Sequence, residues 1–208
     1  PEEAPEPAEW MGGRPWWEWT RATGNWGGLR DQLEDASVSL AGSYTFDWLS
    51  VWSGGVNRRA STRTLLDLNT TFDLERMFGL SGATVFADFY STDGRGQEDI
   101  GDIQGVSNIE TDENDDQLAE LWFEKWMLDR RLRLKVGKID ANTEFGFPES
   151  AAEFSHSGPA YSPTNFMLPT YPDPAVGVVA FVYPSDRCYV GAGFFHAAAG
   201  ARLRTAAH

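Results

Sequence analysis

Residues 117–138, with the sequence QLAELWFEKWMLDRRLRLKVGK, constrain the fold of this chain more than any other stretch. Polar and apolar side chains alternate on both sides of 128–131, which predicts two strands joined by a tight polar turn. Alternate residues of a strand point to opposite faces, so one face of this hairpin is apolar and the other is charged. The apolar face comprises Leu121, Phe123, Met127, Leu132, Leu134 and Val136, and the charged face comprises Glu120, Trp122, Glu124, Trp126, Arg133 and Lys135. A soluble sheet packs such an apolar face on a core, whereas a membrane barrel turns it toward lipid and its charges toward a wet lumen.

The composition of the chain limits the classes of protein to which it can belong. The 208 residues carry a formal net charge of -14, which argues against binding nucleic acid or an anionic membrane surface by charge. No run approaches the roughly 20 apolar residues that a transmembrane helix needs, but the alternating strands of a transmembrane barrel escape that test. The 9 Trp and 13 Phe suit interfacial girdles, sugar-stacking platforms or a core. The single cysteine, Cys188, excludes an intrachain disulfide and is expected to be a small buried residue.

Five further segments carry strand patterns, at 38–52, 63–74, 83–90, 175–183 and 188–196. The first three alternate apolar with polar residues, whereas the last two are apolar on both faces. Together with the hairpin they give about seven antiparallel strands, most of them near the roughly 9–11 residues that a tilted barrel strand requires. A short helix is expected at 26–36, where Leu29 and Leu33 lie four residues apart on one face.

The predicted connections alternate in length. Short connections fall at 75–82, 128–131 and 184–187, and long ones at 91–116 and 141–173. Outer-membrane barrels show this asymmetry, with short periplasmic turns and long outer loops. The long connections are therefore expected to face outward or to fold into the pore. The chain is expected to have three parts: a flexible Pro-, Glu- and Trp-rich segment at 1–23, a barrel portion at 24–196 and an atypical tail without strand alternation at 197–208.

The polar faces of the predicted strands form the candidate site. Their side chains are expected to line a pore and to form hydrogen bonds with sugar hydroxyls, while Tyr90 or Trp122 stacks on sugar rings. The candidate lining residues are Asp47, Arg63, Asp67, Asn69, Asp88, Tyr90, Glu120, Trp122, Glu124, Arg133 and Lys135. An equally weighted alternative is that these side chains only keep the lumen wet.

Nothing in the sequence favours catalysis or metal binding. Glu120 and Glu124 flank Trp122 on one strand face and suggest the acid and base of a glycosidase, but similar residues recur on this face across several strands, which favours a lining. The acidic run ETDENDD at 110–116 lacks the spacing and central glycine of an EF-hand loop, so a solvated loop is expected. No metal-ligand spacing joins the three histidines, His156, His196 and His208. We expect no catalytic residue, no metal and no cofactor.

Several stretches, taken in order, resemble the OprB-type carbohydrate-selective porin family. They are GNWGGLRDQLEDASVSLAGSY at 24–44, VSNIET at 106–111, LAELWFEKWMLDRRLRLKVGKIDANTEFG at 118–146 and SHSGPAYSPTNFMLPTYPDPAVGV at 155–178. Each motif alone is weak, but their order and spacing together are specific. The resemblance implies a barrel in the outer membrane of a Gram-negative cell, through which sugars and other small solutes diffuse.

The fold expected from these observations is all-β, an antiparallel transmembrane β-barrel of porin type, present here as an incomplete barrel with a short N-terminal helix. Family members are longer, so this chain is expected to supply only part of a barrel. Its expected partners are carbohydrate solutes and outer-membrane lipid, with no nucleic acid. Lipid does not tolerate unpaired strand edges, so closure requires further strands or self-association of the chain.

Two other functions stay open at the level of sequence. The first is a soluble β-domain that binds carbohydrate through exposed aromatic residues, which requires the apolar faces to pack on each other in a core. Detergent dependence separates it from the porin. The second is a hydrolase that uses Glu120 and Glu124, which a screen on glycosides would reveal.

Overall fold

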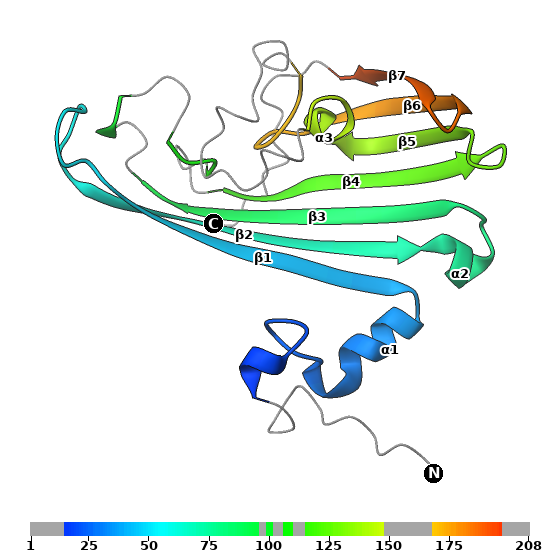
Figure 1. The fold of residues 1–208 in the computed structure, drawn as a ribbon, viewed down its shortest axis with the longest axis horizontal. Coiled ribbons are helices and arrows are strands. Elements are labelled where there is room, and N and C mark those ends of the chain that lie inside the picture. The colour runs from blue at the N-terminus through cyan, green and yellow to red at the C-terminus, as the bar shows by residue number, and fades with distance from the viewer. Residues whose placement is uncertain (1–14, 96–98, 102–105, 110–114, 148–167, 197–208) are drawn as a thin grey trace.

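The computed structural model describes residues 15–95, 99–101, 106–109, 115–147 and 168–196. In these residues one antiparallel sheet has the strand order β1-β2-β3-β4-β5-β6-β7, so each strand pairs with its neighbour in sequence. The strands are β1 (Val38–Ser50), β2 (Ala60–Asp73), β3 (Ala83–Gly94), β4 (Asp115–Met127), β5 (Leu132–Ile139), β6 (Ala175–Ser185) and β7 (Cys188–Phe195). The sheet curls without closing, with β1 and β7 at its two edges (Figure 1). The prediction of seven antiparallel strands is confirmed.

Short helices precede and connect the strands. The segments η1 (Trp16–Glu18), η2 (Trp26–Gly28) and α1 (Leu29–Asp35) precede β1, which confirms the helix expected at 26–36. Gly27 and Gly28 join η2 to α1 with φ values of 67° and 93°, a backbone region that glycine adopts readily because it has no Cβ. No helix among the described residues is both long enough and apolar enough to cross a membrane.

Two more helices lie in the connections. Helix α2 (Leu74–Phe78) follows β2, because the Asp73 side chain accepts a hydrogen bond from the Arg76 N–H and caps the helix. Leu74, expected to extend the apolar face of the strand, therefore begins a helix instead. Helix α3 (Ala141–Phe145) follows β5 directly and lies on the hollow side of the curled sheet (Figure 1).

One face of the sheet, here called the outer face, is mainly apolar along all seven strands, with Lys125 and Lys138 among its charged exceptions. The register aligns Leu68 with Gly42 and Phe89, and Phe123 with Val85 and Val136. The outer face includes Tyr44, Phe46, Trp48, Leu66, Leu68, Phe72, Leu121, Phe123, Leu132, Leu134, Val136, Val178, Val182, Val190 and Phe194. Many of these side chains are exposed, among them Tyr44 at 66% and Phe194 at 80%. The soluble alternative requires this face to pack in a core, and the described residues provide no such cover.

The connections at the two ends of the strands differ as expected. Residues 74–82, 128–131 and 186–187 join strands at one end, whereas 51–59, 95–114 and 140–174 join them at the other. Cys188, expected to be buried, is exposed because it begins β7 directly after a two-residue turn. The proposed tail at 197–208, most of the acidic run at 110–116, and both His156 and His208 lie outside the described residues. The division into three parts stays a prediction.

Candidate functional site on the inner face of the sheet

The opposite face of the sheet, here called the inner face, carries all eleven residues that the sequence singled out. The register pairs Asp47 with Arg63 and Asn69 with Asp88, and Glu124 with Lys135. The remaining positions fall on the same face by the same pairing: Asp67, Tyr90, Glu120, Trp122 and Arg133. Five strands, β1 to β5, therefore contribute to one surface. That this surface lines a pore stays a prediction.

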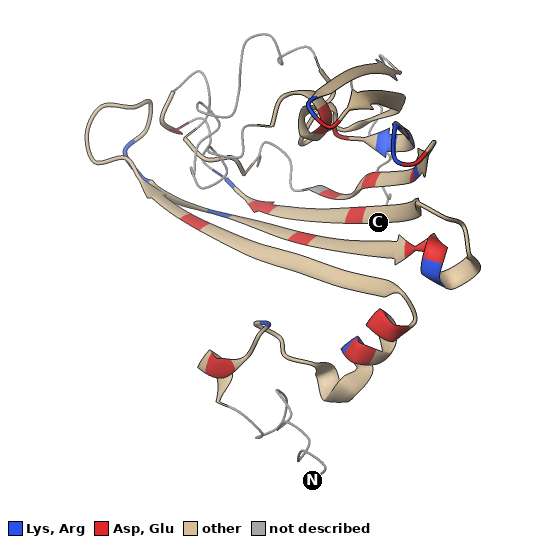
Figure 2. Ribbon diagram, turned by 45° about the vertical axis from the view of Figure 1, so that its right-hand side comes forward, with Lys and Arg blue, Asp and Glu red and all other residues tan. Residues whose placement is uncertain are grey.

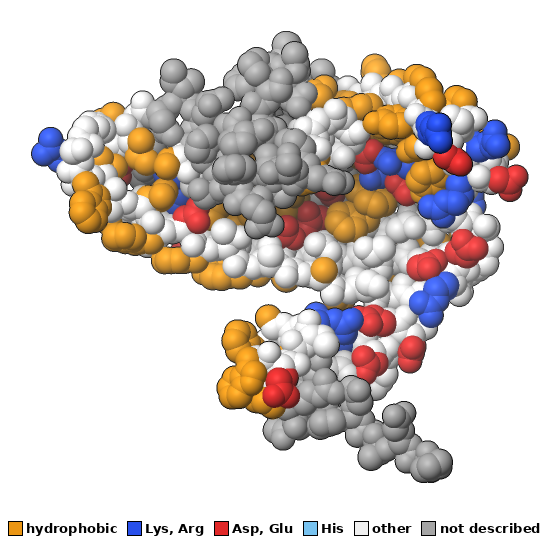
Figure 3. All heavy atoms as spheres, in the orientation of Figure 1, with side chains coloured by type: hydrophobic (Ala, Val, Ile, Leu, Met, Phe, Trp, Pro, Cys, Tyr) orange, Lys and Arg blue, Asp and Glu red, His pale blue; other side chains and the backbone are white. Residues whose placement is uncertain are grey.

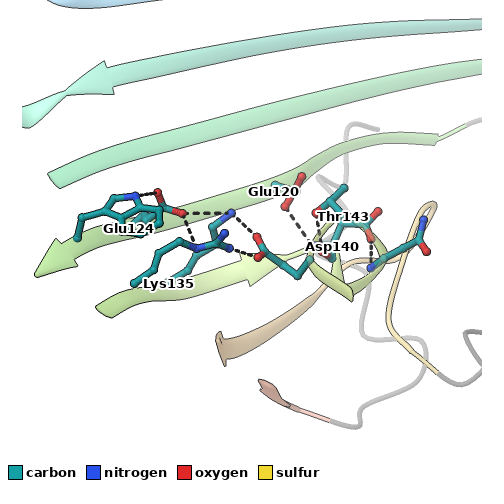
Figure 4. A network of polar contacts seen from close by, with 9 residues as sticks. Glu120, Glu124, Lys135, Asp140 and Thr143 are labelled. Atoms are coloured by element: carbon teal, nitrogen blue, oxygen red, sulfur yellow. Dashed lines mark hydrogen bonds and ion pairs between the residues drawn. The ribbon is translucent and has the colours of Figure 1, made fainter. Parts of the chain in front are cut away.

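A cluster of four charged side chains, here called the charge cluster, joins β4 and β5 to helix α3 (Figure 4). Lys135 Nζ lies 2.5 Å from Glu144 Oε1, and Arg133 also pairs with the Glu144 carboxylate. Arg133 Nε lies 3.2 Å from Glu124 Oε2, and Lys135 Nζ lies 3.7 Å from the same oxygen. The Glu144 side chain is only 4% exposed. Two cations and two carboxylates thus neutralise each other and hold α3 on the inner face.

Asp140 turns the chain from β5 into α3. Its side chain caps the helix, since Oδ1 accepts a hydrogen bond from the Asn142 N–H at 2.7 Å. Its own N–H donates to Glu120 Oε2 at 2.9 Å, and its Oδ2 accepts from the Tyr171 N–H at 3.0 Å (Figure 4 labels Glu120 and Asp140). One carboxylate therefore ties the start of α3 to the later part of the same connection.

The later part of the β5–β6 connection also lies on the inner face. The Ala141 N–H donates to the Pro169 carbonyl at 2.8 Å, and Gln117 Nε2 donates to the Pro172 carbonyl at 2.6 Å. The rings of Tyr90 and Tyr171 meet edge to face with centroids 5.4 Å apart. Both described ends of this long connection are thus fixed against the inner face of the sheet.

Aromatic and aliphatic side chains cover the inner face of β6 and β7 and of the last residue of β5, Ile139. Ile139, Val179 and Phe181 form a buried core cluster, and Phe145 of α3 stacks on Phe181 with centroids 5.5 Å apart. A Cβ added at Gly193 would lie 2.9 Å from the Phe145 ring, so only glycine leaves room for this ring. Strands β6 and β7 are therefore apolar on both faces for a physical reason. Their outer-face residues belong to the apolar outer face, and their inner-face residues pack against α3.

At the long-connection end, the residues that follow β3 are fastened to the connection between β1 and β2. Asp99 accepts hydrogen bonds from Asn57 Nδ2 at 2.9 Å and Arg59 Nε at 2.6 Å, while its carbonyl accepts from the Val56 and Asn57 N–H groups. The hydrogen bond from Arg59 is the main reason why the pKa of Asp99 is lowered. Ser107 Oγ donates to Asp47 Oδ2 at 2.5 Å, so this connection also reaches the inner face.

Two inner-face residues are more enclosed than the sequence predicted. Arg63 has no exposed surface, and none of its guanidinium nitrogens has a hydrogen-bond partner in the part of the chain that the structure describes. The Trp122 ring stacks on Phe86 with centroids 4.8 Å apart and also lies 3.8 Å from Lys135 Nζ. The ring that was expected to stack on sugars is thus already in contact with two protein groups.

The geometry weakens the hydrolase alternative. Glu120 and Glu124 are four residues apart on β4, about 13 Å along an extended strand. That is wider than the separation of about 6.5–9.5 Å found between the carboxyl groups of inverting glycosidases. Glu124 is also neutralised by Arg133 and Lys135, and Glu120 accepts a backbone hydrogen bond.

Sequence analysis missed several residues that shape this surface. Asp140 had a usable signal, because an aspartate followed by Asn142 and Thr143 at the end of a strand fits a helix N-cap. Glu144, Asp99 and Phe181 had none, since each acts through residues on other strands or loops. Among the described residues, no group of three or more His, Cys, Asp and Glu side chains could hold a metal ion.

A curled antiparallel sheet with an apolar outer face, a charged inner face and an inward-folded connection defines a wall of a porin-type outer-membrane barrel. The sequence model of the carbohydrate-selective porin, OprB family, matches residues 57–202. The chain therefore belongs to the OprB family of carbohydrate-selective porins, which are proteins of the outer membrane. The family is a class of channels rather than of enzymes.

Two solved structures share the fold. The high pH structure of Pseudomonas putida OprB matches with a TM-score of 0.74 and 20% sequence identity, covering 85% of this chain and 44% of that one. The low pH structure of the same protein matches with a TM-score of 0.52 and 18% identity, covering 85% of this chain and 50% of that one. The chain thus spans about half the length of the porin chains that it matches. No match was found among curated proteins.

Proposed function

We propose that this chain forms part of the wall of an outer-membrane channel through which carbohydrates and other small solutes diffuse. The observation that carries the proposal is the two-faced sheet: every candidate lining residue shares the inner face, while the outer face is mainly apolar and uncovered. A barrel wall needs this arrangement, because lipid accepts only apolar side chains and a wet bore needs polar ones.

We infer two roles for the inner-face residues: some hold α3 in place, and others contact solutes. Glu124, Arg133 and Lys135 belong to the charge cluster, so we infer that they fix α3 in place rather than contact solutes. Trp122 supports the wall in the same way through Phe86 and Lys135. Their shared role is to hold α3, the beginning of the β5–β6 connection, on the inner face of the sheet.

The solute-contacting surface is then centred on β2 and β3. Asp67, Asn69 and Tyr90 are neighbours in the register and only partly buried. Asn69 Nδ2 lies 3.5 Å from Asp67 Oδ1, a long contact that a sugar hydroxyl could replace. Carboxylate, amide and phenol groups together accept and donate hydrogen bonds, as polyhydroxylated solutes require. The preference for carbohydrate rests on this chemistry and on the family.

Closure of the channel requires partners for the two edge strands. The unpaired N–H and C=O groups of β1 and β7 would each cost several kcal/mol in hydrocarbon. We propose that pairing of these edges, either by further strands of a longer protein or by a second copy of this chain, completes the barrel. Light scattering of the detergent-solubilised protein distinguishes the two sources, since only the second gives a mass twice that of one chain.

Swelling of proteoliposomes tests the channel. The complete protein should admit uncharged sugars at rates that fall steeply with sugar size. Asn69→Trp places a large ring on the inner face and should slow sugar entry, whereas Thr70→Trp, the next residue on the opposite face, should leave the rate unchanged. Sugar entry no faster than in protein-free liposomes, or equal slowing by both variants, would contradict the proposal.

A further inference from the structure

We propose that the end of the sheet with the short connections binds the phosphate groups of membrane phospholipids, and that its turns are set in the headgroup layer. The surface concerned, here called the turn rim, comprises residues 73–82, 128–131 and 184–187 together with Lys125. It forms the edge of the wall at one membrane surface, away from the inner-face residues that line the proposed channel. The inference therefore goes beyond the proposed function.

The connections of the turn rim are tied to one another. The Trp126 N–H donates to the Gly82 carbonyl at 2.8 Å, and Lys125 Nζ donates to the Ser81 carbonyl at 2.5 Å. The Tyr183 N–H donates to the Arg131 carbonyl at 2.9 Å, so β6 reaches the same turn. Figure 2 shows basic and acidic positions on α2 and in the neighbouring turns, and blue and red side chains gather at this end in the space-filling view (Figure 3). The rim is thus one continuous charged surface.

Large apolar side chains stand at the tips of these turns, where polar residues, glycine and proline are usual. Phe78 is 69% exposed, Leu80 47% and Leu128 71%. Leu128 also has a φ of 54°, in the left-handed region that glycine or asparagine adopts more readily than leucine. These tips gain free energy if their side chains leave water for the edge of the hydrocarbon layer.

Lys125 fixes the level at which the headgroups lie. It belongs to the outer face, where it lies opposite Ala83 in the register. Its amine turns toward the end of the strand and reaches the Ser81 carbonyl. A lysine on a lipid-facing surface does this when its aliphatic stem lies along hydrocarbon and its charge reaches the headgroups. The apolar tips beside Ser81 therefore continue the lipid-facing surface to its edge.

The bases of the turn rim form no ion pair with any other residue that the structure describes. Lys125 and Arg131 donate to backbone carbonyls, and the Arg130 guanidinium lies 4.8 Å from the centre of the Trp126 ring. The full set of bases is Arg76, Lys125, Arg130, Arg131 and Arg187. Carbonyls and rings stabilise a cation without cancelling its charge, so these side chains can attract an anionic group.

The charge balance of the rim also suits a phosphate. Its five bases face four acids, Asp73, Glu75, Asp129 and Asp186, which leaves one positive charge, whereas the whole chain carries a formal net charge of -14. The Asp73 and Glu75 carboxylates accept from N–H groups of their own connection. Lysine and arginine near a lipid surface are attracted to anionic headgroups, and apolar side chains beside them enter the boundary of the acyl chains.

Native mass spectrometry tests the site on the complete protein, transferred from detergent with either phosphatidylglycerol or diacylglycerol, which lacks the phosphate. We expect the protein to retain phosphatidylglycerol in preference to diacylglycerol. Lys125→Met and Arg76→Gln each remove a charge while keeping much of the side-chain length, and each should weaken phosphatidylglycerol binding by about fivefold. Arg58→Gln removes an exposed base at the opposite end of the sheet and should leave this binding unchanged.

A fluorescent probe tests the depth of the turns. Cys188, the single cysteine, is first replaced by serine, so that Leu128→Cys or Ser53→Cys supplies the one thiol for a bimane label. In phospholipid vesicles, the label at 128 should be quenched by lipids that carry a nitroxide at the headgroup, and little by iodide in the water. The label at 53, in the β1–β2 connection at the other end of the sheet, should be quenched mainly by iodide.

The outcomes distinguish this inference from the proposed channel. Equal retention of the two lipids, unchanged binding in both Lys125→Met and Arg76→Gln, or an equal loss in Arg58→Gln would overturn the phosphate site. Quenching of the label at 128 mainly by iodide would overturn the placement of the tips in the headgroup layer. Sugar entry into proteoliposomes tests the channel separately, because binding of lipid at the rim does not require solute to pass.

Discussion

The inner faces of β1–β4 and of β5–β7 belong to one sheet, yet they meet different surroundings. On β1 to β4 the inner face carries Asp47, Asp67 and Asp88; Asp47 accepts from the Ser107 hydroxyl and Asp67 lies near the Asn69 amide. On β5 to β7 it carries Ile139, Val179 and Phe181, which Phe145 of α3 helps to bury. The outer face is mainly apolar across both parts. The difference teaches that the outer-face side chains are mainly apolar on every strand, whereas the polarity of the inner-face side chains depends on whether a connection packs on that part of the sheet.

The two parts meet at the charge cluster. Lys135 and Arg133 lie on the first strand of the apolar part, and Glu124 lies on the last strand of the polar part. Glu144 comes from the helix that covers the boundary. At this boundary Arg133 and Lys135 each form ion pairs with two carboxylates, Glu124 from the polar part and Glu144 from α3.

The largest expected effect is in the apolar part. Phe181→Ala removes a ring that is 5% exposed and contacts the rings of Phe145, Tyr183 and Tyr189. It should lower the free energy of unfolding by about 3–5 kcal/mol, as measured by urea titration in lipid vesicles. Phe46→Ala on the outer face makes the same chemical change where no protein core exists and should cost much less. Similar losses from both would show that the inner face of β6 is not a packed core.

Introducing a charged side chain on the outer face should cause the next largest loss of stability. Leu134→Arg places a cation toward lipid and should destabilise the barrel by about 2–4 kcal/mol if the residue lies near mid-depth. Ala41→Arg introduces the same side chain on the inner face of β1, which is exposed, and should have little effect on stability. Unfolding in lipid vesicles measures both. A larger loss from Ala41→Arg would reverse the assignment of the faces.

A substitution in the charge cluster, at the boundary between the two parts, should cause a smaller loss of stability. Glu144→Gln removes a buried carboxylate that pairs with two cations, and should cost about 2 kcal/mol, because Glu124 remains as a partner. Single-channel recordings should also become noisier as α3 loosens. The control is Glu34→Gln, whose pair with Arg21 is about 40% exposed and should contribute below about 0.5 kcal/mol. Quiet channels of unchanged stability after Glu144→Gln would mean that α3 is held by Phe145 alone.

The smallest expected effect is local and depends on pH. The pKa of Asp99 is lowered, chiefly by the hydrogen bond from Arg59, so its contribution is present above the usual carboxyl pKa of about 4 and is lost as pH falls through the lower folded value. Hydrogen exchange at the Val56 and Asn57 amides, which donate to the Asp99 carbonyl, should therefore speed up below about pH 4 beyond the intrinsic trend. Asp99→Asn should show fast exchange at neutral pH as well. Protection that persists in Asp99→Asn would mean that the backbone contacts hold this loop without the carboxylate.

The face on which each strand residue lies follows from local sequence alone. A strand has a period of two, so the position of Leu121 relative to Glu120, or of Leu68 relative to Asp67, is settled locally once the strand forms. The seven strands, the hairpin turn at 128–131 and the shared face of all eleven candidate residues followed from that rule. The weak alternation of β6 and β7 was visible too, although its cause was not.

The contacts of each inner-face residue, in contrast, depend on how distant segments pack on the sheet. Glu144 pairs with Lys135 nine residues away, and Phe145 lies over Gly193, because the chain turns back at Asp140 and lays α3 on the sheet. No periodicity encodes such contacts, since they depend on where a long connection goes rather than on the direction of a side chain. The same reason separates Arg133 and Lys135, which form ion pairs with α3, from Asp67, which lies near the Asn69 amide: all three are inner-face strand residues, and α3 covers only the first two.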